Sequence, residues 1–203
     1  FWIGLNELVA PLMSSAITVM LGVVITGAFH EDGFADTADS LGGFSPERRL
    51  EIMRDSRVGT FGSLALIFSV LVRVIALAEL GPIHGLIALV LAHSVGRSLA
   101  TLVMATTPPA AKEGLGQSYT AHLPKSRVFA MGVFIAACSV ACGPAGLTGY
   151  MIALAGAGLV VIFAKRSFGG TTGDVLGAVE QIGEMAMLTT AARLVAEHGW
   201  QWG

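Results

Sequence analysis

The sequence predicts an all-α bundle of membrane-spanning helices, because it is apolar throughout and its few charges are clustered. Apolar residues make up 54% of the 203 positions and charged residues only 13%. An ordinary soluble domain carries about 25% charged residues, so this composition is typical of a polytopic membrane protein. The net charge of -2 gives no electrostatic reason to expect a nucleic-acid partner. We expect a single transmembrane domain over residues 1–203.

Six hydrophobic stretches come close to the length of about 20 residues that crosses a bilayer. They are residues 8–29, 59–80, 84–105, 127–143, 146–164 and 175–197. The fourth and fifth are separated only by the Cys-Gly-Pro-Ala-Gly segment 142–146, which favours a tight reversal, with a kink as the alternative. The chain begins at Phe1, and we expect one further span before it.

Lysine and arginine residues predict the orientation of these spans. They concentrate in the loops that follow the first, third and fifth spans, whereas the alternate loops at 81–83 and 144–145 hold none. We therefore expect the loops at 43–58, 106–126 and 165–174 on the cytoplasmic side of the membrane. The C-terminal residues 200–203 would then lie at the opposite interface.

An acidic stretch over residues 30–43 follows the first span directly. In a helix, the spacing of Asp32, Asp36 and Asp39 places them on one face, while Glu31 points elsewhere. Such a stripe of like charges repels itself unless a cation neutralises it. Mg²⁺ prefers oxygen ligands and is usually held by one or two carboxylates plus water and phosphate oxygens. The pattern favours a magnesium site, and a solvated acidic turn is the alternative.

A short basic helix is predicted after this stretch, because Ser45-Pro46 is a good helix start. It would run through Arg57 at the bilayer surface, with Leu50 and Met53 as its apolar positions. Its arginines suit anionic lipid heads or a phosphate compound bound beside the metal, and both interpretations stay open. They are Arg48, Arg49, Arg54 and Arg57.

The segment 165–174 combines a basic pair, a Gly/Thr-rich turn and the start of the last span. Free backbone N–H groups at a helix N-terminus bind anions, so Arg166 is a candidate phosphate ligand. Asp174 either completes the metal shell or caps the last helix. The loop 106–126, which contains Pro108-Pro109, is a substrate loop or an ordinary surface loop.

Carboxylates inside the last span need an explanation, because charged groups are costly in a membrane. Glu180 and Glu184 are spaced i, i+4 and are either functional or partners of an arginine such as Arg97. We expect a polar network of Glu31, Arg97, Glu180 and Glu184, with a structural role for Glu184. In a transporter, the rival function, these glutamates with Arg73 and Arg97 would line an ion path. The densest polar cluster lies instead at the cytoplasmic end of the first span, which favours an enzyme.

Four motifs resemble, in the same order, the adenosylcobinamide-GDP ribazoletransferase family, also called cobalamin synthases. They are the segments 30–43, 49–62, 113–116 and 169–174. The resemblance implies a Mg²⁺-dependent membrane enzyme that joins adenosylcobinamide-GDP to α-ribazole or its 5′-phosphate and releases GMP. A more distant likeness to CDP-alcohol phosphotransferases lacks their later Gly-x-x-x-Asp-x-x-x-Asp pattern, which disfavours a phospholipid enzyme.

The residue patterns and the family resemblance together give a hypothesis for the active site. We expect the protein in the inner membrane, with this site facing the cytoplasm. The expected partners are the two small-molecule substrates and the lipid bilayer, and an oligomer is compatible with the sequence. The assigned roles are metal binding for Asp32, Asp36, Asp39 and Asp174, phosphate binding for Arg54, Arg57 and Arg166, and proton acceptance from the ribazole hydroxyl for Asp39 or Asp55.

Overall fold

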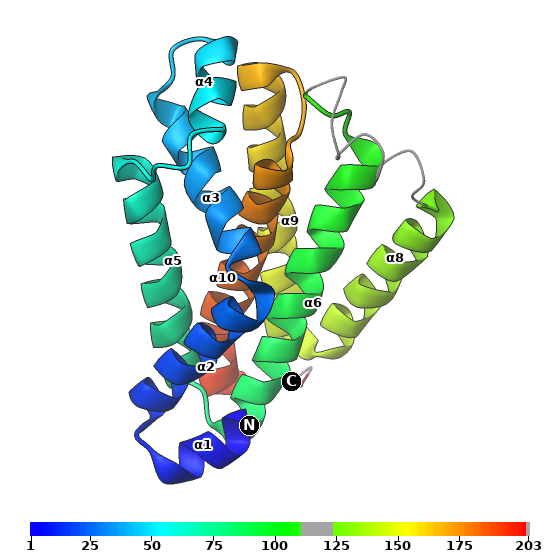
Figure 1. Cartoon of the computed structure of the whole chain (residues 1–203). Helices are drawn as coiled ribbons and strands as arrows, with labels where there is room; N and C mark the ends of the chain where they lie inside the picture. The colour runs from blue at the N-terminus through cyan, green and yellow to red at the C-terminus, as the bar shows by residue number, and fades with distance from the viewer. Residues whose placement is uncertain (111–123, 202–203) are drawn as a thin grey trace.

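The computed structural model describes residues 1–110 and 124–201, and its regular elements are helices (Figure 1). In chain order they are α1 (Trp2–Leu8), α2 (Pro11–Thr26), α3 (Phe29–Asp39), the 3₁₀ turn η1 (Ser40–Gly42), α4 (Pro46–Met53), α5 (Thr60–Ala78), α6 (Pro82–Thr106), α8 (Lys125–Ala141), α9 (Gly143–Phe168) and α10 (Gly173–His198). This architecture confirms the prediction of an all-α bundle.

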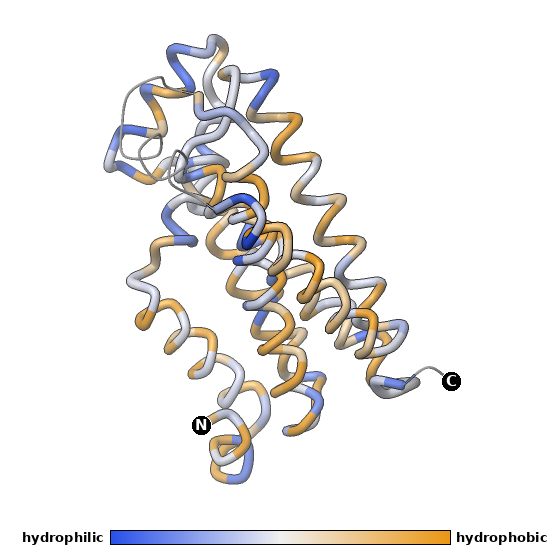
Figure 2. The backbone as a smooth tube through the Cα atoms, turned by 90° about the vertical axis from the view of Figure 1, so that its right-hand side faces the viewer, coloured by the Kyte–Doolittle hydropathy of each residue, from blue (hydrophilic) through white to orange (hydrophobic). Residues whose placement is uncertain are grey.

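Helix α10 is the centre of the bundle, and α3, α5, α6 and α9 pack around it. Leu77, Val95, Leu99 and Met187 are buried in the core where these helices meet. The outer faces are also apolar, with large side chains such as Phe68 exposed. Along most of the helices, hydrophobic residues predominate and strongly hydrophilic ones are few (Figure 2). Helices that are apolar both inside and outside belong in lipid.

Three helices, α5, α6 and α9, are long and apolar enough to cross a membrane. A fourth span results if α2 and the segment Phe29–Gly42, which meet at a 90° bend, are taken together. The two other predicted spans correspond to α8, which has 17 residues, and to α10, which carries three carboxylates in its first half. The described residues therefore support a membrane protein, and the count of six spans stays a prediction.

The first predicted span, 8–29, is wrong as a single helix. Helix α1 ends at Leu8, and Pro11 begins α2. Helix α2 then ends at Thr26, because Gly27 and Ala28 both take the left-handed conformation, with φ of 65° and 58°. That conformation is costly for alanine, so the surrounding packing must hold it. The bend turns the acidic helix α3 onto the side of α10.

The predicted reversal between the fourth and fifth spans is confirmed. Cys142 ends α8, and Gly143, with φ of 72°, begins α9. The two helices run in opposite directions (Figure 1). The predicted loop 106–126 pairs at its start with the Gly/Thr-rich turn, where the N–H of Ala110 donates to the carbonyl of Thr171 at 2.9 Å. The motif at 113–116 lies outside the described residues.

Helix α4 begins as predicted and ends earlier. The hydroxyl of Ser45 accepts a hydrogen bond from the N–H of Arg48 at 3.2 Å, and Pro46 is the first helical residue. The helix ends at Met53, four residues before the predicted end at Arg57. Met53 is buried against Ala164 and Phe168. The apolar side of α4 therefore packs on the protein, and its place at the bilayer surface stays a prediction.

Candidate functional site

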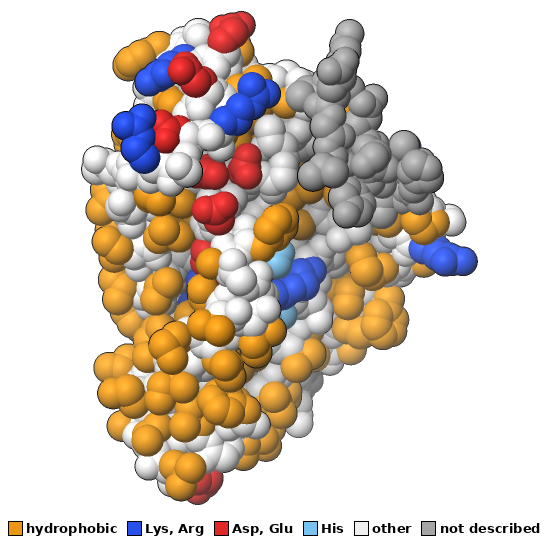
Figure 3. Space-filling model, viewed as in Figure 1, with side chains coloured by type: hydrophobic (Ala, Val, Ile, Leu, Met, Phe, Trp, Pro, Cys, Tyr) orange, Lys and Arg blue, Asp and Glu red, His pale blue; other side chains and the backbone are white. Residues whose placement is uncertain are grey.

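Charged side chains gather at one end of the bundle, above a body covered by hydrophobic residues (Figure 3). Helix α4, the C-terminal end of α9 and the N-terminal end of α10 all lie at that end (Figure 1). The Gly/Thr-rich turn is far in the sequence from the acidic stretch and the basic helix, and the fold brings all three to the same end. This end is the candidate active site.

The acidic helix α3 touches the first turn of α10 directly. A Cβ atom placed on Gly33 would lie 2.8 Å from the Cα of Asp174, so only glycine permits this approach. The contact brings Asp174 close to Asp32 and Asp36, and the charge of Asp36 is repelled by those of Asp32, Asp174 and Asp39. Asp32 is exposed, and Asp36 and Asp174 are half-buried. We call Asp32, Asp36 and Asp174 the acidic face.

Asp174 does not cap its own helix. The hydroxyl of Thr172 accepts a hydrogen bond from the N–H of Val175 at 3.3 Å and donates to Asp174 Oδ2 at 3.2 Å. Burial raises the pKa of the Asp174 carboxyl, the hydrogen bond from Thr172 opposes that rise, and the charge of Asp32 adds to it. Because Thr172 caps the helix, the Asp174 carboxylate is left available for a ligand or a proton. Its raised pKa makes it a better proton acceptor near neutral pH.

The acidic face offers oxygen ligands alone, which is the donor set that Mg²⁺ prefers. Its three carboxylates do not converge on one point. Within the described residues, the group of three whose ligand atoms lie within 4.8 Å of one another is His93, Glu180 and Glu184. Two carboxylates of the acidic face, completed by substrate phosphate oxygens and water, nevertheless match the usual way in which Mg²⁺ is held.

Asp39 points away from the acidic face and holds the start of α5. Its side chain is only 8% exposed. Its two oxygens accept hydrogen bonds from the N–H groups of Gly59 at 2.7 Å and Gly62 at 2.8 Å. A Cβ on Gly62 would lie 2.4 Å from a carboxylate oxygen, which explains the glycine at that position. An anion here also stabilises the positive end of the helix dipole.

Replacing Asp39 by Ala should lower the free energy of unfolding by about 1–2 kcal/mol, since it removes the acceptor for two N–H groups at a helix start. Denaturant unfolding of the purified protein in detergent measures this change. Asp55→Ala is the matched control and should leave the stability near that of the parent. Unchanged stability in Asp39→Ala together with a loss of Mg²⁺ binding would instead return Asp39 to the metal ligands.

Asp55 and Arg57 form an exposed pair with each other. Arg57 donates to both carboxylate oxygens, from Nε to Oδ1 at 3.0 Å and from Nη2 to Oδ2 at 2.6 Å. Hydrogen bonding to Arg57 lowers the pKa of Asp55 to about 2. A carboxylate with so low a pKa accepts protons poorly near neutral pH, so the geometry does not suit Asp55 as a general base.

Arg54 and Arg166 are exposed at the same end of the bundle, and within the described residues neither guanidinium has a hydrogen-bond or ion-pair partner. Arg49, one of the four arginines predicted to bind lipid heads or phosphate, has a structural role. Its Nε donates to the carbonyl of Gly43 at 2.8 Å, and its guanidinium contacts the hydroxyl of Ser167 and lies over the ring of Phe163. Arg49 therefore fastens α4 to α9, while Arg54 and Arg166 are free to bind anions.

A second polar cluster lies deeper in the bundle. Arg73 donates to Glu184 at 3.0 Å and to Glu31 at 3.1 Å, and all three side chains are buried. Gln181 adds a hydrogen bond from Nε2 to Glu31 at 3.2 Å. The sequence placed Glu31 and Glu184 in a network and missed Arg73 as its centre. The signal was present, because an arginine inside a span needs a partner.

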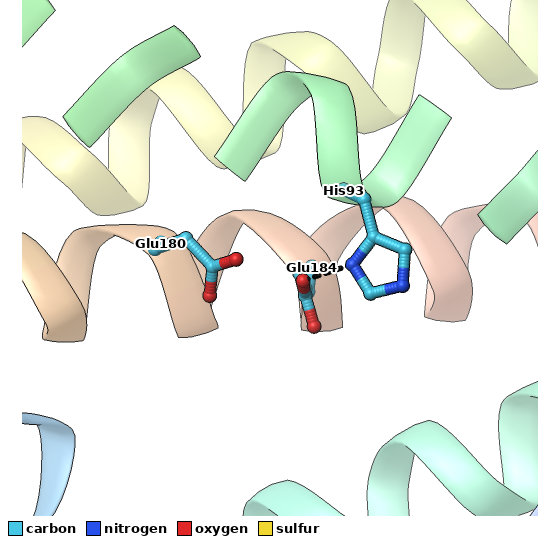
Figure 4. Close-up of side chains that lie close together, drawn as sticks. All are labelled: His93, Glu180 and Glu184. Atoms are coloured by element: carbon cyan, nitrogen blue, oxygen red, sulfur yellow. Dashed lines mark hydrogen bonds and ion pairs between the residues drawn. The ribbon is translucent and has the colours of Figure 1, made fainter. Parts of the chain in front are cut away.

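Arg97 joins the same cluster from α6. Its Nη1 lies 3.2 Å from Glu180 Oε1 and 3.4 Å from Glu184 Oε1. Glu184 also contacts the ring of His93, while Glu180 lies one turn earlier on α10 (Figure 4). A cation between these two glutamates would meet the guanidinium of Arg97. The cluster of His93, Glu180 and Glu184 is therefore already neutralised by protein and is a poor metal site.

Comparisons with known proteins agree with the four motifs. The family model described as cobalamin-5-phosphate synthase matches residues 1–192. A relative from Bradyrhizobium diazoefficiens named adenosylcobinamide-GDP ribazoletransferase is 44% identical over 94% of this chain and 73% of its own length. Proteins of the same name from Azorhizobium caulinodans and Stutzerimonas stutzeri are each 39% identical, over 92% and 93% of this chain and 74% and 78% of their own lengths. No solved structure matches.

Proposed function

The chain belongs to the cobalamin-5-phosphate synthase family, and from this we propose that it joins adenosylcobinamide-GDP to α-ribazole, or to its 5′-phosphate, with release of GMP. The observation that supports this reaction best is the acidic face, which the close approach of Gly33 to Asp174 assembles at the same end of the bundle as the exposed arginines Arg54 and Arg166. Carboxylates for a cation and guanidinium groups for phosphate are the groups that a pyrophosphate substrate requires.

In the proposed reaction, a hydroxyl oxygen of ribazole forms a bond to the phosphorus that carries the cobinamide. The bond between that phosphorus and the oxygen of GMP breaks, and GMP leaves with the electron pair. The hydroxyl proton passes to a carboxylate of the acidic face. Asp174 suits this role, because burial raises its pKa.

Asp32 and Asp36 would hold a Mg²⁺ ion, which supplies neutralisation of the charge on the pyrophosphate and on the leaving GMP. Arg54 and Arg166 would bind phosphate oxygens, for which the planar guanidinium is well shaped. Asp39 would position the site without contacting the substrate, because its hydrogen bonds fix the start of α5 at the end of α3.

Arg54→Ala should raise the KM for adenosylcobinamide-GDP about tenfold or more, because a charge-assisted contact to phosphate is lost. The change should leave folding intact, since Arg54 is exposed. Arg48→Ala is the matched control, because Arg48 is on α4, which Arg54 directly follows, and pairs with Glu51 at the surface. A KM equal to that of the parent would assign Arg54 to lipid contact. Steady-state kinetics at saturating ribazole measures both variants.

We place the charged end of the bundle on the cytoplasmic side of the inner membrane, following the distribution of lysine and arginine. Glu51→Cys, on the exposed side of α4, tests this in a background that lacks Cys138 and Cys142. A thiol reagent that cannot cross the membrane should label position 51 in inside-out vesicles and leave it unlabelled in intact cells. Labelling of intact cells would reverse the orientation.

The reaction itself is tested by incubating the purified protein with adenosylcobinamide-GDP, α-ribazole and Mg²⁺ and measuring GMP by chromatography. We expect GMP and the joined corrinoid to appear in equal amounts, and to disappear when a chelator removes Mg²⁺. Hydrolysis of the substrate to GMP without any joined product would contradict the proposed transfer.

A further inference from the structure

A groove of ≈ 540 Å³ opens between α2, α6 and α8, and none of the residues of the acidic face line it. Its volume falls in the range of about 300–1,000 Å³ that is usual for small-molecule sites. Ile25, Met131 and Ile135 form its apolar walls. Its polar wall comes from one face of α6, with His93, Ser94, Arg97, Ser98 and Thr101.

This polar wall lies in the middle of a helix that is apolar enough to span a membrane. His93 and Arg97 are nine or more residues from both ends of α6, which has 25 residues. Their side chains are nevertheless 43% and 40% exposed. A half-exposed charge at the centre of a span is costly when lipid covers it, so such a group marks a site for a polar ligand or water.

Several hydrogen-bonding groups on this wall have no partner within the described residues. The hydroxyls of Ser94 and Ser98 make no hydrogen bond there, and Arg97 uses only Nη1 for its contacts with Glu180, Glu184 and the carbonyl of His93. Nε and Nη2 of Arg97 are left over. Glu180 and Glu184 hold the Arg97 guanidinium in position, so its remaining N–H groups are preorganised to bind a ligand in the groove.

We propose, building on the function inferred above, that this groove binds the ribazole substrate, with the aromatic base against the apolar walls and the ribose hydroxyls against Arg97, Ser94 and Ser98. Of the two substrates, only ribazole is small enough for the groove. Its methylated base has little hydrogen-bonding capacity, which suits the apolar walls of the groove.

The charges around the groove favour the nucleoside part over a phosphate. Arg73 and Arg97 are paired with Glu31, Glu180 and Glu184, and His30 and His93 lie beside them. Because both guanidinium groups already have carboxylate partners, the wall offers little net positive charge to an added phosphate. The 5′-phosphate of a phosphorylated substrate would therefore lie outside the groove, and Arg97 would contact ribose hydroxyls.

The position of the groove suits a substrate that reacts at the acidic face. Arg97 contacts Glu180, and Glu180 follows Asp174 on α10 by six residues, a rise of about 9 Å. That distance is comparable to the length of a nucleoside. Thr26, on the groove wall, ends α2, and Asp32 lies in the first turn of α3 after the bend.

The test is calorimetric binding of α-ribazole to the purified protein without corrinoid and without Mg²⁺. Ile135→Trp fills the groove from α8 and should raise the Kd about tenfold or more, while Ile67→Trp, on the exposed outer side of α5, should leave it unchanged. Ser98→Ala removes the hydroxyl with little change in side-chain volume and should raise the Kd by about fivefold. This second variant keeps the test valid if the tryptophan variant misfolds. α-Ribazole 5′-phosphate should show the same losses.

An unchanged Kd in both groove variants would overturn the assignment of the groove. A rise in Kd seen only for α-ribazole 5′-phosphate, and not for α-ribazole, would also overturn the assignment, because it would show that this wall binds phosphate. Binding that vanishes in phosphatidylcholine nanodiscs would mean that lipid fills the groove, which contradicts the proposal as well. Failure of GMP release with intact α-ribazole binding would reject the proposed reaction and leave the groove assignment standing.

Discussion

Asp36→Asn should lower the rate of GMP release by about 10²- to 10⁴-fold, because stabilisation of transition-state charge by a metal ion amounts to several kcal/mol. Asp36 is the middle residue of the acidic stripe on α3, and it interacts with the charges of both Asp32 and Asp174. It is therefore the carboxylate best placed to bind a cation together with either neighbour. Asparagine keeps the size of the side chain and removes its charge.

The folded state should tolerate Asp36→Asn, and its stability should stay equal or rise slightly, since one source of like-charge repulsion is removed. The variant thus separates function from folding. Single-turnover GMP release at saturating Mg²⁺ measures the rate, and denaturant unfolding measures stability. A rate within a few-fold of the parent would show that the acidic stretch is a solvated turn without a catalytic role.

Arg73→Met should be the most destabilising single change in the polar interior, by about 3–5 kcal/mol. Its guanidinium is buried and pairs with both Glu31 and Glu184. Removing it leaves the two carboxylates partly unpaired, although Gln181 and Arg97 still contact them. Unfolding in detergent measures the loss. Arg48→Met, which breaks an exposed pair with Glu51, should cost less than about 1 kcal/mol.

A double variant checks the physical reason for that loss. If uncompensated charge causes it, Arg73→Met combined with Glu31→Gln should be more stable than Arg73→Met alone. If the loss came only from packing, the second substitution would add a further loss. An Arg73→Met protein as stable as the parent would mean that the buried pairs contribute no net stability.

The sequence predicted those features that depend on local chemistry. The capping hydroxyl of Ser45 with Pro46 located the start of α4, and the Gly-Pro segment at 142–146 located the reversal between α8 and α9. The helical spacing of Asp32 and Asp36 likewise predicted their shared face, because that spacing is set by the helix alone. The membrane bundle followed from composition.

Features that depend on packing between distant segments could not be predicted. The spacing of Asp39 matched the acidic stripe, but its carboxylate accepts hydrogen bonds from the N–H groups of Gly59 and Gly62 instead. These groups come within hydrogen-bonding distance only in the folded protein. The break at Gly27 and Ala28 is hidden in an apolar run. The partners of Arg73 come from α3 and α10, 42 and 111 positions away in the sequence.

The location of the metal is the central claim, and Mn²⁺ binding followed by electron paramagnetic resonance in the presence of GDP tests it most directly. Mn²⁺ prefers the same oxygen ligands as Mg²⁺. We predict that Asp36→Asn and Asp32→Asn each weaken Mn²⁺ binding about tenfold or more, while His93→Gln, in the deeper cluster, leaves it unchanged. Loss of Mn²⁺ binding in His93→Gln, with full binding in both aspartate variants, would contradict the account and place the metal between α6 and α10.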